Sequence, residues 1–277
     1  MVHGADQRGW GRSVRKPGER GLTGPTSRVL ADMAAFITSH LSSDAGAPPV
    51  FVMGHSMGGG QALTLACHPD YQESVVRRVR GWLLESPFIS FSPEEQPSTV
   101  KVLAGRLAGK LLPHHQLKHA IMPQHLSRDL AVRESILADA LMHNTGTLEG
   151  LAGLLDRTAA LAAGQVRPLK GGALRSLWVG HGTEDKTTWF AASKKYFDEY
   201  TGEVADKEFR VYEGWYHQLH ADGPDSEVFY KEVGDWILKK VGEDVQGQVE
   251  QEAQAEEESP AVVAPAENVE ASPEAKL

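Results

Sequence analysis

Ser56 is the side chain of this sequence whose surroundings most clearly suggest chemistry. It lies at the centre of Gly54-His55-Ser56-Met57-Gly58, between an apolar run at 50–53 and helix-forming residues at 61–66. A strand that turns sharply into a helix holds such a serine hydroxyl clear of the backbone. This turn, or elbow, is expected to need glycine at 54 and 58, because a Cβ at either position would collide with neighbouring backbone. The pattern predicts a nucleophile; the alternative is a strand-to-helix turn with an idle serine.

A serine hydroxyl is a weak nucleophile near neutral pH and needs a histidine base that an acid orients. Asp185 and His217 each follow a segment with the pattern of a strand, in the order serine, acid, histidine. The carboxyl ends of parallel strands meet at one edge of a sheet, so the fold can bring these residues to Ser56. Glu184 is the alternative acid, and His220 is the alternative base.

No metal or cofactor is expected from the sequence. His115 and His119 have the spacing of ligands on one helical face, and His114 adjoins them, but no carboxylate completes the set. The glycines at 58–60 follow the elbow and allow close packing rather than forming a nucleotide loop. The single cysteine, Cys67, is expected to be a buried apolar residue, and it cannot form an internal disulfide.

Predicted strands alternate with predicted helices along most of the chain. This pattern implies an α/β fold, a mostly parallel sheet with helices on both faces. The expected strands cover 50–53, 81–85, 175–180 and 208–212, and the expected helices cover 26–41, the segment after Ser56, 187–200 and 225–241.

Residues 87–172 interrupt this alternation, because they contain no convincing strand. Helical segments at 98–112 and 151–161 carry apolar residues along one face. An insertion between two sheet strands is expected to form a helical cap over the carboxyl edge, where open α/β sheets bind ligands. The alternative is that these helices extend the core.

Composition separates a folded body from a tail. The 277 residues are 41% hydrophobic and carry a net charge of −9, and residues 242–277 hold ten acidic residues and one lysine. The body, 1–241, is therefore close to neutral, and nucleic-acid binding is not expected. The tail has no aromatic residue and is expected to be disordered. No apolar run approaches a membrane span and no signal peptide is visible, which favours a cytoplasmic location.

These pieces together resemble the monoacylglycerol lipases of the α/β-hydrolase superfamily, in particular the fungal monoglyceride lipase-like group. The resemblance spans about residues 2–241. It rests on the opening motif Asp6-Gln7-Arg8-Gly9-Trp10-Gly11-Arg12-Ser13, the elbow at 54–59, the cap stretch 145–151, and the segments 182–185 and 212–220.

The resemblance implies a catalytic triad in which Ser56 is the nucleophile, Asp185 the orienting acid and His217 the general base. It implies hydrolysis of a monoacylglycerol to glycerol and a free fatty acid through an acyl-serine intermediate, without a cofactor. The remaining implied site residues are Met57, whose backbone N–H would be an oxyanion donor, and His220 and His55, which would bind substrate at the polar end of the pocket.

The resemblance also gives the cap a second role. The apolar helix at 98–112 would settle on a membrane or lipid droplet and admit the acyl chain. The protein would then be cytoplasmic with peripheral contact to lipid surfaces.

One departure from the family concerns the N-terminus. Only five residues precede Asp6, whereas family members carry the first strands and a His-Gly loop that gives a second oxyanion donor. The chain is expected to lack these strands and to leave sheet edges unpaired, and losing one donor typically lowers the rate ~10²–10³-fold. Two alternatives therefore stay open: a catalytically impaired fragment or pseudoenzyme of the same fold, and a serine hydrolase for another ester or an amide.

Overall fold

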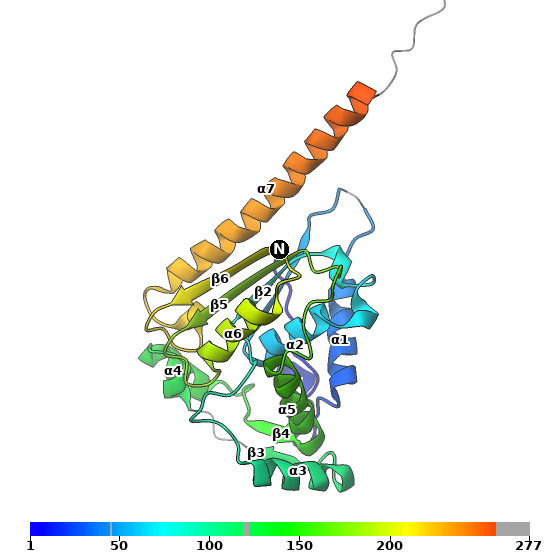
Figure 1. Ribbon diagram of the computed structural model, residues 1–277. Coiled ribbons are helices and arrows are strands. Elements are labelled where there is room, and N and C mark those ends of the chain that lie inside the picture. Colours follow the sequence, from blue (N-terminus) through cyan, green and yellow to red (C-terminus); the bar gives the residue numbers. More distant parts are fainter. Residues whose placement is uncertain (45, 119–121, 259–277) are drawn as a thin grey trace, which may run out of the picture. The chain divides into compact units, whose positions relative to one another are not determined.

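The computed structural model describes residues 1–44, 46–118 and 122–258, and its central element is a four-stranded parallel sheet (Figure 1). The strand order is β1-β2-β5-β6, and every neighbouring pair is parallel. The parallel α/β sheet predicted from the sequence is therefore confirmed. The strands are β1 (Val50–His55), β2 (Val79–Glu85), β5 (Ser176–Gly182) and β6 (Asp206–Tyr212).

Among the described residues, six helices follow the predicted order with shifted ends, and a seventh, α4, was not predicted. They are α1 (Thr26–Thr38), α2 (Met57–Ala66), α3 (Thr99–Leu111), α4 (Leu130–Ala138), α5 (Leu148–Ala162), α6 (Phe190–Tyr200) and α7 (Ser226–Glu258). Helix α6 begins three residues later than predicted. The cause is Asp185, whose carboxylate accepts the backbone N–H groups of Thr187 and Thr188 and so holds both residues in the preceding loop.

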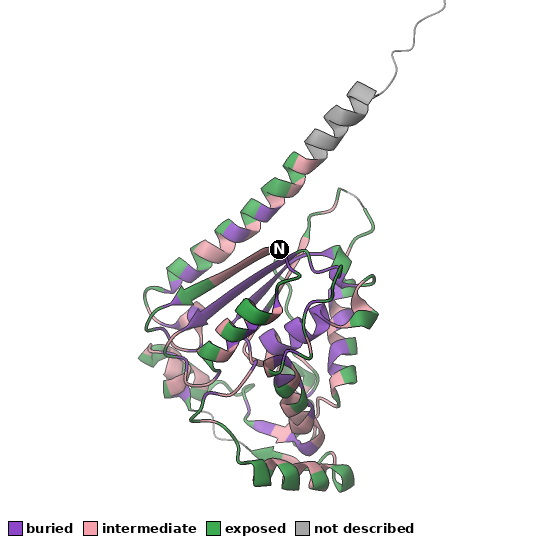
Figure 2. Cartoon of the chain, in the orientation of Figure 1, coloured by how far each residue is buried: buried purple, intermediate pink, exposed green. Residues whose placement is uncertain are grey.

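Alternate residues of the central strands enter two different cores, as the two-residue period of a strand requires. On one face, Trp82 and Leu84 of β2 pack with residues of α1, α2 and α6. On the other face, Leu83 packs with Phe229 and Trp236 of α7. Strands β2 and β5 are buried along their whole length, while β6 is half-exposed (Figure 2). Helices on both faces thus cover the sheet, as predicted.

The segment 87–172 holds α3, α4 and the whole of α5, together with two short strands that the sequence did not predict. Strands β3 (Gln116–Lys118) and β4 (Thr145–Thr147) pair antiparallel. Three residues are too few to show a strand period, which explains why they were missed. His115 therefore precedes a strand rather than lying in a helix, and His119 lies outside the described residues.

The described part of this segment contacts both a loop near His217 and the main core. The loop before α4 contacts the loop after His217, because the Leu126 carbonyl accepts the Gln218 N–H at 2.8 Å. In contrast, α5 ends in the main core, where Leu161 is fully buried. The described part of the segment thus joins the site at one end and the core at the other.

The opening motif forms a compact loop rather than a strand. Residues 1–7 are neither helix nor strand, and among the described residues β1 has a strand neighbour only on its β2 side. The opening residues thus add no strand to the sheet beside β1. The Asp6 carboxylate accepts the Arg12 N–H at 2.9 Å, and a Cβ at Gly11, where φ is +49°, would collide with that carboxylate. The positive φ and the close approach of Asp6 together favour glycine at 11.

The end of the chain differs from the predicted disorder. Helix α7 continues past residue 241 to Glu258, and residues 259–277 lie outside the described part of the chain. The physical reason is helix propensity, since glutamate, alanine and glutamine favour a helix even without an apolar stripe. Residues Met1–Ile237 form one compact unit and Leu238–Leu277 a second. Among the described residues, none of the helices combines the length and apolar character needed to cross a membrane.

Candidate active site

The elbow places Ser56 between the end of β1 and the start of α2. Its backbone lies at φ +52° and ψ −119°, a region that non-glycine residues rarely adopt. A Cβ at Gly54 would lie 2.6 Å from the Gly58 carbonyl oxygen, so glycine at 54 is required. A Cβ at Gly58 would meet nothing within 4 Å, so the predicted collision at 58 is wrong. The backbone of Gly58 packs against Gly54, whereas the position of a Cβ on Gly58 itself is open.

We expect Gly54→Ala to destabilise the protein by about 1–3 kcal/mol, the usual cost of forcing extra atoms into a packed site. Gly58→Ala is the matched control, because the structure leaves room for its methyl group. Thermal unfolding of both variants measures the difference. Equal loss of stability in the two variants would contradict this account of the elbow.

Ser56, His217 and Asp185 meet at the carboxyl edge of the sheet. The Ser56 hydroxyl lies 2.7 Å from His217 Nε2, and His217 Nδ1 lies 2.7 Å from Asp185 Oδ2. The side chains of His217 and Asp185 are almost fully buried. The arrangement has the geometry of a nucleophile, a base and an orienting acid.

Asp185 is held by five hydrogen-bond donors. Its Oδ1 accepts the N–H groups of Thr187 and Thr188, and its Oδ2 accepts the Thr188 hydroxyl, His217 and His181. Burial alone would raise the pKa of the Asp185 carboxyl. The charge of His217 and the hydrogen bonds from His181 and His217 outweigh burial and hold this pKa well below its usual range. Asp185 is therefore an anion fixed in one orientation.

The alternative acid and base are placed elsewhere. Glu184 is exposed, and its backbone N–H donates to the carbonyl of Trp215. His220 Nδ1 lies 2.7 Å from Glu85 Oε1, so the ring of His220 pairs with Glu85 and not with Ser56. The geometry thus favours Asp185 and His217 over these alternatives.

His55 and His220, the expected substrate-binding residues, lie beside the triad together with Glu85. The His55 ring is 4.7 Å from the His217 ring and 5.2 Å from the His220 ring, measured between centroids. His55 Nε2 lies 3.3 Å from the His217 carbonyl oxygen. Glu85 Oε1 accepts both the backbone N–H of His220, at 3.1 Å, and its Nδ1, at 2.7 Å.

The pKa values of His55, Glu85 and His220 depend on one another. Burial is the main cause that lowers the pKa of His55 to about 4, so its ring is neutral near pH 7. Burial would raise the pKa of Glu85, but His55 and His220 lower it. Burial would lower the pKa of His220, but the hydrogen bond and charge of Glu85 raise it. Glu85 is thus a buried anion, and its potential ligand atom lies within 4.8 Å of one from each of His55 and His220.

Comparison with known proteins identifies the family. A sequence profile of the family described as Serine aminopeptidase, S33 matches residues 1–224. The chain belongs to this family. Solved structures agree on its α/β-hydrolase fold: a soluble variant of monoglyceride lipase from Saccharomyces cerevisiae superposes with a TM-score of 0.74 at 22% identity, covering 85% of this chain and 76% of that one.

Relatives of this S33-family hydrolase include named lipases. The protein named "Putative monoglyceride lipase" of Schizosaccharomyces pombe is 29% identical over 243 residues, which is 86% of this chain. The chain spans about 60% of the length of that relative. A monoacylglycerol lipase of Mycolicibacterium smegmatis is 28% identical, over 86% of this chain and 78% of its own length. The resemblance to monoacylglycerol lipases inferred from the motifs is confirmed.

The backbone N–H of Met57 is the oxyanion donor that the resemblance implies. Met57 is the first residue of α2, and the N–H groups of a first helical turn have no partner within the helix. The Ser56 carbonyl, in contrast, accepts the N–H groups of Gly60 and Phe88. A helix N-terminus attracts negative charge, so this position suits a developing oxyanion.

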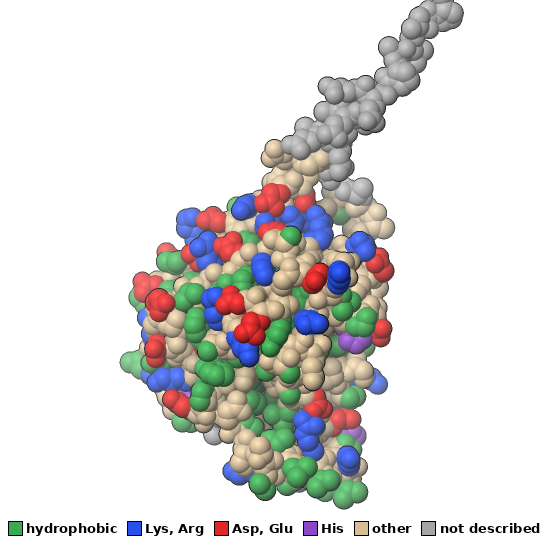
Figure 3. All heavy atoms as spheres, viewed as in Figure 1, with side chains coloured by type: hydrophobic (Ala, Val, Ile, Leu, Met, Phe, Trp, Pro, Cys, Tyr) green, Lys and Arg blue, Asp and Glu red, His purple; other side chains and the backbone are tan. Residues whose placement is uncertain are grey.

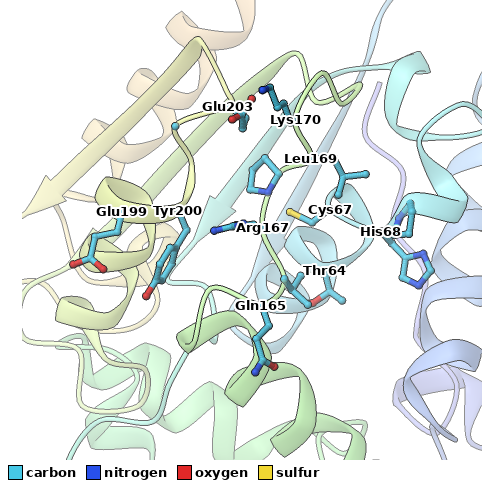
Figure 4. A pocket seen from close by; sticks show the side chains of 14 residues that line it. Thr64, Cys67, His68, Gln165, Arg167, Leu169, Lys170, Glu199, Tyr200 and Glu203 are labelled. Carbon is cyan, nitrogen blue, oxygen red and sulfur yellow. The ribbon is translucent and has the colours of Figure 1, made fainter.

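A pocket of about 600 Å³ lies away from the triad. Its lining includes Cys67 and His68, which follow the C-terminal end of α2, and Tyr200 at the end of α6 (Figure 4). Ser56 precedes the other end of this ten-residue helix, about 15 Å away at 1.5 Å per residue. Cys67 is buried, as expected, and burial raises the pKa of its thiol to about 12. This pocket is therefore separate from the chemistry at Ser56.

Sequence reasoning missed three polar side chains that support the site. Thr188 and His181 bind Asp185, and Glu85 binds His220. Glu85 offered one signal, a charged residue at the end of a buried strand. Thr188 and His181 offered none, because neither belongs to a recognisable pattern.

Proposed function

We propose that this hydrolase cleaves the ester bond of monoacylglycerols and releases glycerol and a free fatty acid. The observation that carries the proposal is the hydrogen-bonded series Ser56–His217–Asp185, with both connecting distances at 2.7 Å. The names of the relatives support the substrate class, since lipases for monoglycerides occur among proteins with 27–29% identity to this chain.

The proposed reaction has two halves. Ser56 Oγ attacks the ester carbonyl while His217 Nε2 takes its proton, and the oxyanion accepts the Met57 N–H. Collapse of the tetrahedral intermediate breaks the ester bond, His217 returns the proton to the leaving glycerol oxygen, and an acyl-serine remains. Water then attacks the acyl-serine with His217 again as base, and Ser56 regains its proton. Asp185 stabilises the positive His217 ring in both halves.

We assign the polar end of the pocket to His55 and His220. His220 is half-exposed, with 38% of its side chain accessible, and its ring lies beside His55. Hydroxyl groups of a glycerol moiety are both donors and acceptors, and imidazole nitrogens can serve either role.

The decisive experiment is a substrate panel with the purified chain. Release of glycerol from a monoacylglycerol, compared with a triacylglycerol and an aminoacyl-nitroanilide, separates the proposed activity from other ester and amide hydrolysis. A fluorophosphonate probe on the same sample reports whether Ser56 is reactive at all. Labelling without monoacylglycerol turnover would favour another substrate, and a folded sample without labelling would favour the impaired fragment or pseudoenzyme.

We further propose that residues 87–172 act as a cap whose outer helix contacts a membrane or lipid droplet. Helix α3 carries four apolar side chains that are 57–83% exposed: Val100, Leu103, Leu107 and Leu111. Hydrophobic side chains gather over α3 at the lower edge of the molecule in Figure 3. A cytoplasmic protein with this surface would reach its lipid substrate by peripheral contact, and the near-neutral body gives no reason to expect nucleic acid as a partner.

The double variant Leu103→Glu/Leu107→Glu is expected to weaken binding to phosphatidylcholine vesicles at least about tenfold, because each leucine transferred from water contributes about 1.5–3 kcal/mol. Turnover of a short, water-soluble ester should be retained. Val228→Glu, which changes a half-exposed apolar residue of α7, is the control. Vesicle flotation measures the effect, and equal flotation of all three proteins would refute the contact through α3.

A further inference from the structure

His55, Glu85 and His220 form a cluster that the sequence does not reveal. They come from the elbow, the end of β2 and the loop after His217, and one potential ligand atom from each lies within 4.8 Å of the others. The proposed hydrolysis needs His217 and Asp185 but does not need the carboxylate of Glu85. That carboxylate is nonetheless buried, with 2% of its side chain exposed.

The donor set suits a transition metal. Two imidazoles and one carboxylate with an open fourth position are a common ligand set for Zn²⁺, whereas Mg²⁺ and Ca²⁺ prefer oxygen ligands alone. An ion from solvent can reach the cluster at His220, because this side chain is half-exposed. A small closure of the cluster would bring the three ligand atoms to tetrahedral spacing around one ion.

The hydrogen bonds around the cluster also favour a ligand role. His55 Nε2 donates to the His217 carbonyl, which fixes the tautomer and leaves the other ring nitrogen with a lone pair. Metal-binding histidines commonly have this kind of outer hydrogen bond to a backbone carbonyl. Glu85 Oε1 accepts both hydrogen bonds from His220, and within the described residues Oε2 accepts none. One oxygen of a buried carboxylate is therefore available.

We propose that His55, Glu85 and His220 bind one Zn²⁺ ion, and that the bound ion inhibits hydrolysis. The ion would sit beside the catalytic base, since the His55 ring is 4.7 Å from the His217 ring. It would repel the positive His217 ring that forms when Ser56 loses its proton, and it would occupy the polar end of the pocket. The inhibition rests on the proposed function, whereas the binding does not.

Competition with a chromophoric zinc chelator tests the binding on the full chain. We expect one equivalent of Zn²⁺ per chain and no displacement by excess Mg²⁺. His220→Ala should weaken this binding ~100-fold or more, because even loss of an outer-shell partner costs 10–100-fold. His68→Ala, which removes a histidine beside the distant pocket, is the matched control. Absence of stoichiometric binding, or unchanged binding by His220→Ala, would overturn the site.

Two further measurements keep the test sharp. X-ray absorption of the zinc-loaded protein should show nitrogen and oxygen ligands at about 2.0–2.1 Å, and a sulfur ligand at about 2.3 Å would instead implicate Cys67. Glu85→Gln preserves side-chain volume and should also weaken binding, with thermal unfolding as the check that it folds.

Inhibition is measured separately on whichever ester the protein turns over. Zinc should lower the rate of the unaltered protein, and EDTA should restore it. For His220→Ala, zinc should lower the rate far less, measured against the rate of the same variant without metal. Stoichiometric binding without inhibition would refute the inhibitory role alone. A protein with no hydrolysis but intact zinc binding would refute the proposed function and leave the zinc site standing.

Discussion

Ser56→Ala is expected to lower kcat for ester hydrolysis by about 10⁶-fold, the size of effect seen when a triad serine is removed elsewhere. In the proposed mechanism the hydroxyl oxygen of Ser56 forms and breaks the acyl bond, and among the described residues no other hydroxyl lies within hydrogen-bond distance of His217 Nε2. The base and acid would remain in place but would have no nucleophile to activate. The residual rate would come from the oxyanion site and substrate binding alone.

The fold of this variant is expected to persist, because alanine and serine experience the same strain at φ +52°. Glycine does not, so Ser56→Gly should be more stable than Ser56→Ala by about 1 kcal/mol. Fluorophosphonate labelling and steady-state kinetics measure the loss of activity, and Ser39→Ala, at an exposed serine, is the control. Undiminished turnover by a folded Ser56→Ala protein would exclude Ser56 as the nucleophile.

The meeting of Ser56, Asp185 and His217 was predictable because each residue follows an element with its own local pattern. Ser56 ends an apolar strand in a glycine-flanked turn, and the segments before Asp185 and His217 have the composition of strands. Parallel strands then bring their carboxyl ends together without further information. The family motifs added the choice between Asp185 and Glu184, which local pattern alone left open.

The Glu85–His220 pair, 135 positions apart, was not predictable, because no local pattern marks either residue as a partner of the other. Each residue alone is only a polar side chain near a strand or in a loop. The same limit applies to the start of α6, which two hydrogen bonds to Asp185 delay. Such features depend on which side chains become neighbours in the folded protein, and the hydrophobic periodicity of a sequence does not show those neighbours.

The helix at 242–258 and the short pair β3–β4 were missed for different reasons. The tail lacks an apolar stripe, so hydrophobic pattern indicated disorder while residue propensity favoured a helix. The strands are too short for any pattern, and Thr147 of β4 donates to the Gly21 carbonyl, 126 positions away. Both cases show that hydrophobic period alone underestimates secondary structure held by propensity or by distant contacts.

Asp185→Asn is expected to lower kcat by about 10⁴-fold, with a much smaller change in KM. The reason lies in the donors around the carboxylate. Oδ1 accepts two backbone N–H groups, so the single oxygen of an asparagine would occupy that position. Its NH₂ group would then face His217 Nδ1, where a donor is needed from the histidine. His217 would adopt the tautomer with its proton on Nε2, which cannot accept the proton of Ser56.

Thr188→Val separates this effect from general damage to the loop, because it removes one hydroxyl donor to Asp185 Oδ2 and keeps the side-chain size. We expect it to reduce kcat far less than Asp185→Asn does. Steady-state kinetics of the two variants make the comparison, and an Asp185→Asn protein within about tenfold of the unaltered rate would contradict the orienting role, given the 10⁴-fold loss expected from a wrong tautomer.

Acid stability gives an independent measure of the same carboxylate. The pKa of Asp185 is lower in the folded protein than in the unfolded chain. Its contribution to stability is therefore fully present above the unfolded value of about 3.9 and is lost as the pH falls toward the folded value. Asp185→Asn removes this titration, so the Tm of the variant should fall less steeply below about pH 4 than that of the unaltered protein. Parallel acid profiles would show that the environment of Asp185 does not favour its anion.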